Sequence, residues 1–178
     1  MAYILNIETS TTNCSVSLSK KGETVVLKED YNSNYSHAER LHIYIDDVLK
    51  EADVSLNELD AIAISKGPGS YTGLRIGVSA AKGLCFALDV PLITIPTLES
   101  LAHQVSTETG VIVSMLDARR MEVYSGVFDA NHSQIRETQA QILNETSFNN
   151  TCPTRSGNCR NRNKNMGKKR WKVCRHLR

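Results

Sequence analysis

The 178-residue sequence predicts an α/β protein assembled from two copies of one unit, with the second copy incomplete. Two observations predict this fold class. Short β-branched segments alternate with segments of helical apolar spacing in the first half of the chain, and the opening pattern of three strands recurs about 108 residues later. A repeat of that length indicates a domain duplication rather than a solenoid.

The first unit, residues 1–108, opens with three short apolar segments whose composition predicts an antiparallel meander. A Ser-x-x-Glu capping box at Ser36–Glu39 then predicts the start of a helix, which the apolar spacing from Leu41 to Ala52 continues. The three predicted strands are Tyr3–Ile7, Cys14–Ser19 and Thr24–Glu29.

Two further strands and two further helices complete the first unit. A mixed sheet with helices alongside, duplicated along the chain, is the ground plan of actin-like and ribonuclease-H-like folds. The predicted segments are a strand at Ala61–Ile64, a glycine and proline loop at Lys66–Gly73, a helix at Leu74–Leu88, a strand at Leu92–Ile95 and a helix at Thr97–Val105.

The second unit, residues 109–150, repeats the meander and then stops. Its predicted strands are Val111–Leu116, Met121–Phe128 and Gln134–Thr138. Too few residues follow for the helices and strands that complete the first unit, so we expect a partial copy.

The remaining segment, residues 151–178, differs in composition from the rest of the chain. It holds ten of the 21 Lys and Arg residues and no acid, which leaves 11 basic and 19 acidic residues before it. Its few large apolar side chains cannot offset the entropy of ordering it. We therefore expect a disordered basic tail, which could also contact RNA phosphates in a salt-dependent way.

The apolar stretches of the sequence are short. Runs such as Ala61–Ile64 and Val111–Val113 are far below the roughly 20 residues that cross a bilayer. The first eight residues lack a basic segment and contain Glu8, so they do not read as a secretory signal. We expect a cytoplasmic protein with no membrane association.

Three segments carry a family resemblance: Ile4–Ser10, Ser65–Gly77 and Leu116–Arg120. The middle one is specific, because its thirteen residues match in order and in context. Together they resemble the bacterial TsaB (YeaZ) family, which is needed to make threonylcarbamoyladenosine in tRNA. The resemblance covers residues 1–150, and the abrupt change near Asn150 leads to the hypothesis of a reading-frame shift.

The resemblance implies a non-catalytic partner subunit that binds TsaD, the larger paralogue that carries the transfer chemistry. TsaD-type proteins hold a metal through two histidines four residues apart on a helix, whereas Thr97 and Leu101 occupy those positions here. His103 is offset from them, and Thr12 and Asn13 replace two acids of the TsaD pattern. We therefore expect no cofactor and no catalytic residue in this chain, with ATP and metal on TsaD, TsaE as a further partner, and tRNA contacted indirectly.

The loop at Lys66–Gly73 admits two interpretations. It leads into a helix N-terminus, where free N–H groups could hold a phosphate, but it lacks the Gly-Lys-Ser/Thr of a phosphate loop. The alternative is a structural turn capped by Ser70 or Thr72. Ser70 is not a hydrolase nucleophile, because Pro68 stands where that motif needs glycine.

The helix after this loop carries small residues at Gly73, Gly77 and Ala80, which allow close approach of another helix. That face could pack on the chain's own helix at residues 41–52. The family resemblance favours an interface with TsaD or with a second copy of the chain, in which Arg75 could pair with a partner carboxylate. The predicted interface residues are Ser70, Tyr71, Thr72, Gly73, Arg75, Gly77 and Ala80.

Two other functions remain open from the sequence. A glycopeptidase-like metalloenzyme would require a metal site or a nucleophile, and we find neither motif. An RNA-binding protein acting through residues 151–178 would bind without TsaD and lose affinity as salt rises.

Overall fold

A computed structural model of the chain describes residues 2–30, 37–144, 147–148 and 172–175. The chain forms two compact units, Met1–Thr97 and Leu98–Arg178. Each unit contains one sheet.

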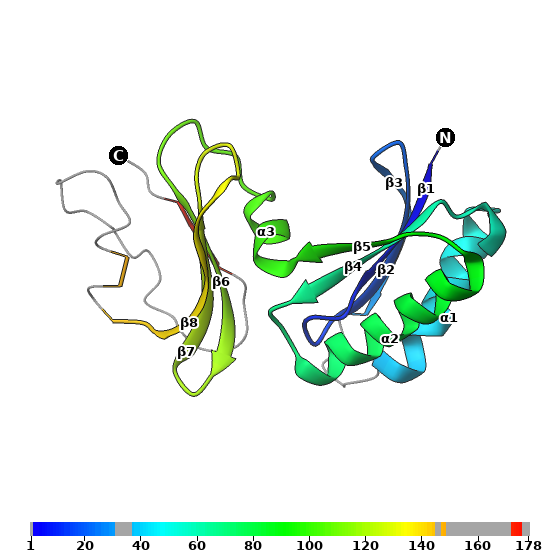
Figure 1. The fold of residues 1–178 in the computed structure, drawn as a ribbon, viewed down its shortest axis with the longest axis horizontal. Coiled ribbons are helices and arrows are strands. Elements are labelled where there is room, and N and C mark those ends of the chain that lie inside the picture. Colours follow the sequence, from blue (N-terminus) through cyan, green and yellow to red (C-terminus); the bar gives the residue numbers. More distant parts are fainter. Residues whose placement is uncertain (1, 31–36, 145–146, 149–171, 176–178) are drawn as a thin grey trace. The chain divides into compact units, whose positions relative to one another are not determined.

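The first unit has a five-stranded mixed sheet with the order β3-β2-β1-β4-β5 (Figure 1). β1 pairs antiparallel with β2 and parallel with β4, and the β4–β5 pair is also parallel. This topology confirms the predicted α/β class. The elements are β1 (Tyr3–Glu8), β2 (Cys14–Lys20), β3 (Glu23–Asp30), α1 (His37–Glu51), η1 (Leu56–Glu58), β4 (Ala61–Gly67), α2 (Tyr71–Leu88) and β5 (Leu92–Pro96).

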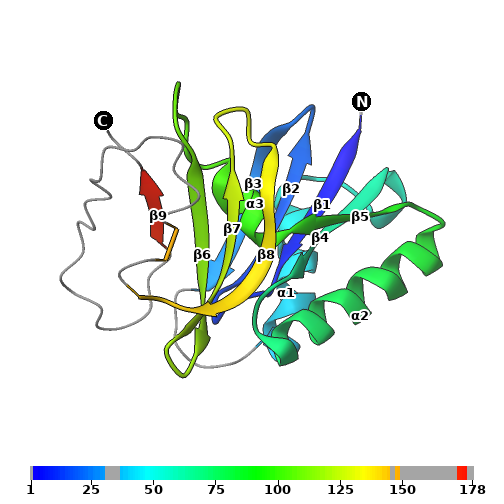
Figure 2. The same ribbon diagram turned by 60° about the vertical axis from the view of Figure 1, so that its left-hand side comes forward.

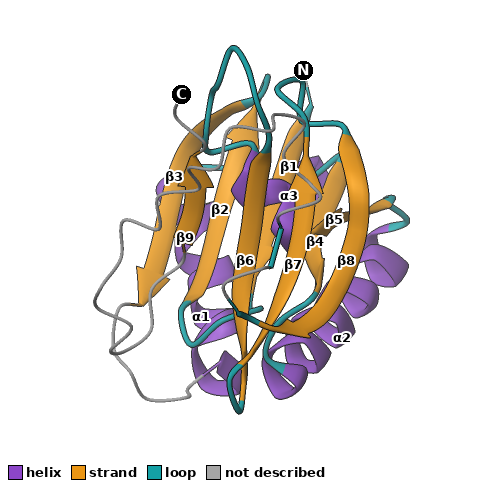
Figure 3. Ribbon diagram, turned by 90° about the vertical axis from the view of Figure 1, so that its left-hand side faces the viewer, coloured by secondary structure: helices purple, strands orange, loops and turns teal. Residues whose placement is uncertain are grey.

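Both long helices, α1 and α2, cover the same face of this sheet, as the view with purple helices behind orange strands shows (Figure 3). The alternation of the strands explains this, because every second side chain turns to the helices. Leu5 and Leu18 are fully buried there, as is Leu41 of α1. An ion pair of 2.8 Å between Arg40 of α1 and the buried Asp30 of β3 also joins helix and sheet.

The second unit has a four-stranded sheet with the order β8-β7-β6-β9 (Figure 2). All its strand pairs are antiparallel. The meander β6-β7-β8 matches the predicted repeat of β1-β2-β3. The elements are α3 (Thr97–Ala102), β6 (Ile112–Arg119), β7 (Glu122–Phe128), β8 (Gln134–Ile142) and β9 (Lys172–Arg175).

The division between the units falls at the start of α3, between Thr97 and Leu98, and not at residue 108 as the repeat length suggested. The reason is packing. Leu98 and Leu101 of α3 share an apolar cluster with Ile112 and Phe128 of the second sheet. A sequence repeat marks where the strand pattern restarts, whereas the structural boundary follows the apolar face of the connecting helix.

Several element boundaries differ from the sequence expectations. α2 starts at Tyr71 rather than Leu74, because Ser70 caps it. α3 ends at Ala102, and β8 continues to Ile142. β9 forms a strand inside the segment expected to be an unstructured tail.

The remaining expectations for residues 151–171 and 176–178, and for the cap at Ser36, lie outside the described residues. None of the helices in the described part of the chain is long and apolar enough to cross a bilayer.

Candidate functional site

The loop before α2 is held by the chain itself. Gly67 has φ +104°, a conformation that L side chains rarely adopt. The Ser70 N–H donates to Ser10 O at 2.6 Å, and the Ser70 hydroxyl accepts from the Gly73 N–H at 3.3 Å. A Cβ at Gly69 would lie 2.5 Å from Ser10 O. This geometry supports the structural turn, with Ser70 rather than Thr72 as the cap.

The inner face of α2 rests on the sheet. Gly73, Gly77 and Ala81 are buried. A Cβ at Gly77 would lie closer than 3.0 Å to Thr9 Oγ1 and 3.1 Å from Ile64 Cδ1. Glycine is therefore required at Gly77 by the close approach of α2 to the end of β1.

The burial of Gly73 and Gly77 corrects their assignment to a partner interface. The small size of Gly77 serves packing inside the first unit, where its neighbours are Thr9 and Ile64 rather than residues of α1. Sequence spacing alone could not distinguish the two faces, because a helix carries small residues wherever any neighbour approaches closely.

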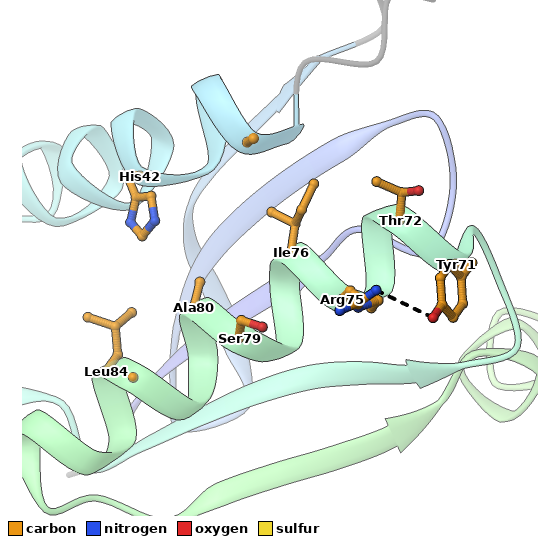
Figure 4. A pocket seen from close by; sticks show the side chains of 10 residues that line it. His42, Tyr71, Thr72, Arg75, Ile76, Ser79, Ala80 and Leu84 are labelled. Atoms are coloured by element: carbon orange, nitrogen blue, oxygen red, sulfur yellow. Dashed lines mark hydrogen bonds between the residues drawn. The ribbon is translucent and has the colours of Figure 1, made fainter.

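The outer face of α2 lines a groove of about 780 Å³ together with the start of α1. Figure 4 shows His42 of α1 across from Ala80 and Leu84 of α2, with Tyr71 and Arg75 at the other end. We call this the α1–α2 groove. Its lining residues are Ala38, His42, Tyr71, Thr72, Arg75, Ile76, Ser79, Ala80, Gly83 and Leu84.

Exposed aromatic side chains stand on the same helix. Tyr71 is 75% exposed in the groove, and Phe86 near the end of α2 is 92% exposed. The Arg75 guanidinium lies 5.4 Å from the centre of the Tyr71 ring and donates to its hydroxyl at 3.4 Å (Figure 4). Aromatic and arginine side chains of this kind dominate the energetics of protein interfaces.

Gly83 is the small residue that faces outward. Among the described residues, and apart from its chain neighbours and the backbone of α2 itself, no atom lies within 4 Å of the position that its Cβ would occupy. The groove is therefore shallow at Gly83, and a partner backbone could approach α2 closely there.

The structure thus brings together part of the predicted interface. Tyr71, Thr72, Arg75 and Ala80 line the groove, and Ser70 caps the helix that carries them. Sequence reasoning missed other residues at this surface. A signal for them was present, because positions 71, 75, 79 and 83 are four residues apart and therefore share one helix face. The missed residues are Ala38, His42, Ile76, Ser79, Gly83, Leu84 and Phe86.

The two helix positions that the family resemblance pairs with metal-binding histidines carry side chains that do not fit a metal. Thr97 is 3% exposed, and its hydroxyl has no hydrogen-bond partner in the described part of the chain. Leu101 packs in the apolar cluster of the second unit. Within the described residues, no group of three or more His, Cys, Asp or Glu could hold a metal ion.

Two cysteine side chains in the first unit are not activated as nucleophiles. Burial, followed by the nearby Asp30 charge, raises the pKa of Cys14 to about 11. Burial also raises the pKa of Cys85 on α2. Both thiols therefore stay protonated at neutral pH, whereas a cysteine nucleophile needs a lowered pKa.

Comparisons with known proteins agree with this picture. The family model described as "TsaD: tRNA N6-adenosine threonylcarbamoyltransferase" matches residues 31–150. The chain is 38% identical over 127 residues to the tRNA threonylcarbamoyladenosine biosynthesis protein TsaB of Haemophilus influenzae, covering 68% of this chain and 51% of that protein. It is 32% identical over 152 residues to the Escherichia coli TsaB, covering 80% of this chain and 63% of that protein.

Solved structures show the same relation. YeaZ from Pseudomonas aeruginosa superposes with a TM-score of 0.68 at 34% identity, covering 80% of this chain and 68% of that one. The ethanolamine utilization protein EutJ from Carboxydothermus hydrogenoformans, at 13% identity and a TM-score of 0.51, shares the fold alone. The chain spans between half and two thirds of the length of the curated relatives cited above.

The fold and the family model together define an actin-like α/β protein related to the threonylcarbamoyltransferases. Within that class, the chain belongs to the TsaB (YeaZ) family.

Proposed function

We propose that this chain is a non-catalytic partner subunit in the formation of threonylcarbamoyladenosine in tRNA. In this proposal the chain binds a TsaD-type threonylcarbamoyltransferase through the α1–α2 groove and supports its transfer of the threonylcarbamoyl group to adenosine. The observation that carries the proposal is an outward helix face with exposed aromatics, an arginine and an open glycine on a chain of this family.

The chemistry of the groove indicates what the partner presents. Among the described residues, its lining is mostly apolar or small, Arg75 is its only Lys or Arg, and no Asp or Glu lines it. A partner helix with a small apolar stripe would bury this surface, and a carboxylate on that helix would pair with Arg75. An arginine–carboxylate pair of this kind contributes chiefly to specificity and to the rate of association.

The non-catalytic role is supported by the residues at the two positions that the family resemblance pairs with metal-binding histidines. Thr97 and Leu101 supply no imidazole, and the thiols of Cys14 and Cys85 are held protonated by burial. The proposal assigns ATP and metal to the TsaD-type partner and contact with tRNA to the assembled complex. It also places the chain in the cytoplasm, where tRNA modification takes place.

A second copy of the chain is a competing occupant of the groove. The proposal predicts a homodimer through α1 and α2 in the absence of the transferase, which dissociates when the transferase is added. TsaE joins as a further partner once that complex has formed.

The test is calorimetric titration of the full chain with a purified TsaD-type transferase, together with an assay of threonylcarbamoyladenosine formation. We expect saturable binding and faster modification of tRNA when the chain is present. Arg75→Glu should weaken binding by about tenfold, as expected for loss of a specific charge contact.

The matched control is Lys50→Glu, the same charge reversal at an exposed α1 position outside the α1–α2 groove. It should leave the affinity unchanged. Absence of binding by the wild-type chain would overturn the proposal. Equal weakening of binding by both variants would show that the α1–α2 groove is not the surface that binds the transferase.

A further inference from the structure

One side of α2 carries a stripe of exposed residues that continues past the α1–α2 groove. Because an α-helix turns about 100° per residue, the positions of this stripe fall within an arc of about 80°. We call it the α2 stripe, and its exposed members are Tyr71, Arg75, Ser79, Lys82 and Phe86. The first three also line the groove, whereas Lys82 and Phe86 lie outside the groove lining.

An aromatic side chain stands at each end of the α2 stripe. Tyr71 is 75% exposed and Phe86 is 92% exposed. At a helical rise of about 1.5 Å per residue, the two positions are about 22 Å apart along the axis of α2. Exposed aromatic rings are typical anchors of protein interfaces, where they fill apolar pockets of the partner. The stripe is therefore long enough to accept about four turns of a partner helix.

The charge of the α2 stripe has one sign. Arg75 and Lys82 are the only charged residues of α2, and no acid occurs in this helix. Neither side chain forms an ion pair with a described residue, and the Arg75 guanidinium lies over the Tyr71 ring instead. Before position 151 the chain has 19 acidic and 11 basic residues, so this stripe is a positive surface on an acidic body.

We propose that the α2 stripe docks an acidic amphipathic helix of the TsaD-type transferase. Two carboxylates of that helix pair with Arg75 and Lys82, and its apolar side chains enclose Tyr71 and Phe86. Carboxylates about two turns apart match the two cations, since seven residues complete about two helical turns. The inference rests on the proposed function and extends its surface beyond the groove, to Lys82 and Phe86.

A second copy of the chain fits the α2 stripe less well. If two α2 helices packed antiparallel about Ser79, Arg75 of each copy would lie near Lys82 of the other. Like charges that face each other across an interface cost free energy and act against the wrong partner. The two cations therefore favour a partner other than the chain itself.

The test is calorimetric titration of the full chain with a purified TsaD-type transferase, for the wild type and for Lys82→Glu and Phe86→Ala. Both side chains are exposed and lie outside the groove lining, so both variants should keep the wild-type melting temperature. Lys82→Glu should weaken binding by about tenfold, because the introduced carboxylate repels those of the partner. Phe86→Ala should weaken it by about thirtyfold, as expected for an aromatic anchor.

The matched controls are Lys50→Glu on α1 and Ile142→Ala on β8, which change an exposed cation and an exposed apolar side chain away from α2. Both should bind with wild-type affinity. Wild-type affinity in Lys82→Glu would overturn the acidic partner, and wild-type affinity in Phe86→Ala would overturn the aromatic anchor. The proposed function would stand in both cases, whereas absence of binding by the wild-type chain would contradict it and the inference together.

Self-association of the same variants, measured by sedimentation without the transferase, separates the two occupants. Lys82→Glu should strengthen self-association several-fold, because the introduced carboxylate would face Arg75 of the second copy. Weaker self-association of Lys82→Glu and Phe86→Ala with unchanged transferase binding would show that the α2 stripe binds a second copy instead.

Discussion

Gly77 and Gly83 lie on the same helix, α2, and they meet opposite environments. Gly77 is buried, and a side chain there would collide with Thr9 at the end of β1. Gly83 faces open space and lines the α1–α2 groove. The two glycines of one helix therefore differ in role. Gly77 allows α2 to pack closely on its own sheet, whereas Gly83 leaves open space at the surface of the groove.

The largest expected effect is on the inner face. Gly77→Leu would force Leu atoms into the space of Thr9 and Ile64, so the chain should lose about 3 kcal/mol of stability, the upper range for overpacked cores. For a chain of this size the melting temperature should then fall by about 6–12 °C. Thermal unfolding followed by circular dichroism measures this, and an unchanged melting temperature would place Gly77 outside the core.

The sequence alone placed Gly77 in a partner interface, which implies the reverse ranking, with partner binding affected more than stability. That ranking assumed a helix face turned to a partner. The measured order of the two effects therefore decides directly between an internal and an external Gly77.

A smaller effect comes from one identical substitution at both glycines. Gly83→Ala should raise stability by about 0.5–1 kcal/mol, because alanine favours the helix and meets no atom. Gly77→Ala should lower it by about 1 kcal/mol, because the clash outweighs the same helix gain. Urea unfolding of the two variants beside the wild type provides the comparison, and a change of the same sign in both would abolish the distinction between the faces.

The two sheets offer a second comparison. β1 pairs in parallel with β4, and α1 provides the crossover that a parallel pair needs. β6 occupies the equivalent place in the second unit but pairs antiparallel with β9. The second unit thus repeats the meander of the first and departs from it after the third strand.

Much of this fold could be predicted because its signals are local. Alternating apolar residues specify β1 and β2, and the spacing from Leu41 onward specifies α1, since the period of burial follows from the period of the backbone. The start of α2 was harder to predict from the sequence. Its first turn contains Gly73, which is typical of a loop, and only the structure shows that Ser70 caps the helix.

The rest depends on contacts between distant segments, which spacing does not encode. To predict the burial of Gly77, one must know that β1 ends beneath α2. To predict the position of α3, one must know that it packs against Ile112 and Phe128. β9 could not be foreseen from a basic segment, because pairing with β6 uses backbone groups that every residue carries. The groove itself was half predicted, since its α2 residues were recognised but His42 of α1 was not.

The central claim is that the outer face of α2 binds the partner, and one titration tests it most directly. Gly83→Leu places a large side chain in the open space of the groove and should not lower the melting temperature, because leucine favours the helix over glycine. Asp47→Leu is the control, at an α1 position that is also exposed and lies outside the groove.

Calorimetric titration of both variants with the TsaD-type transferase should show at least a tenfold loss of affinity, about 1.4 kcal/mol, for Gly83→Leu and wild-type affinity for Asp47→Leu. Wild-type affinity in Gly83→Leu would contradict the account.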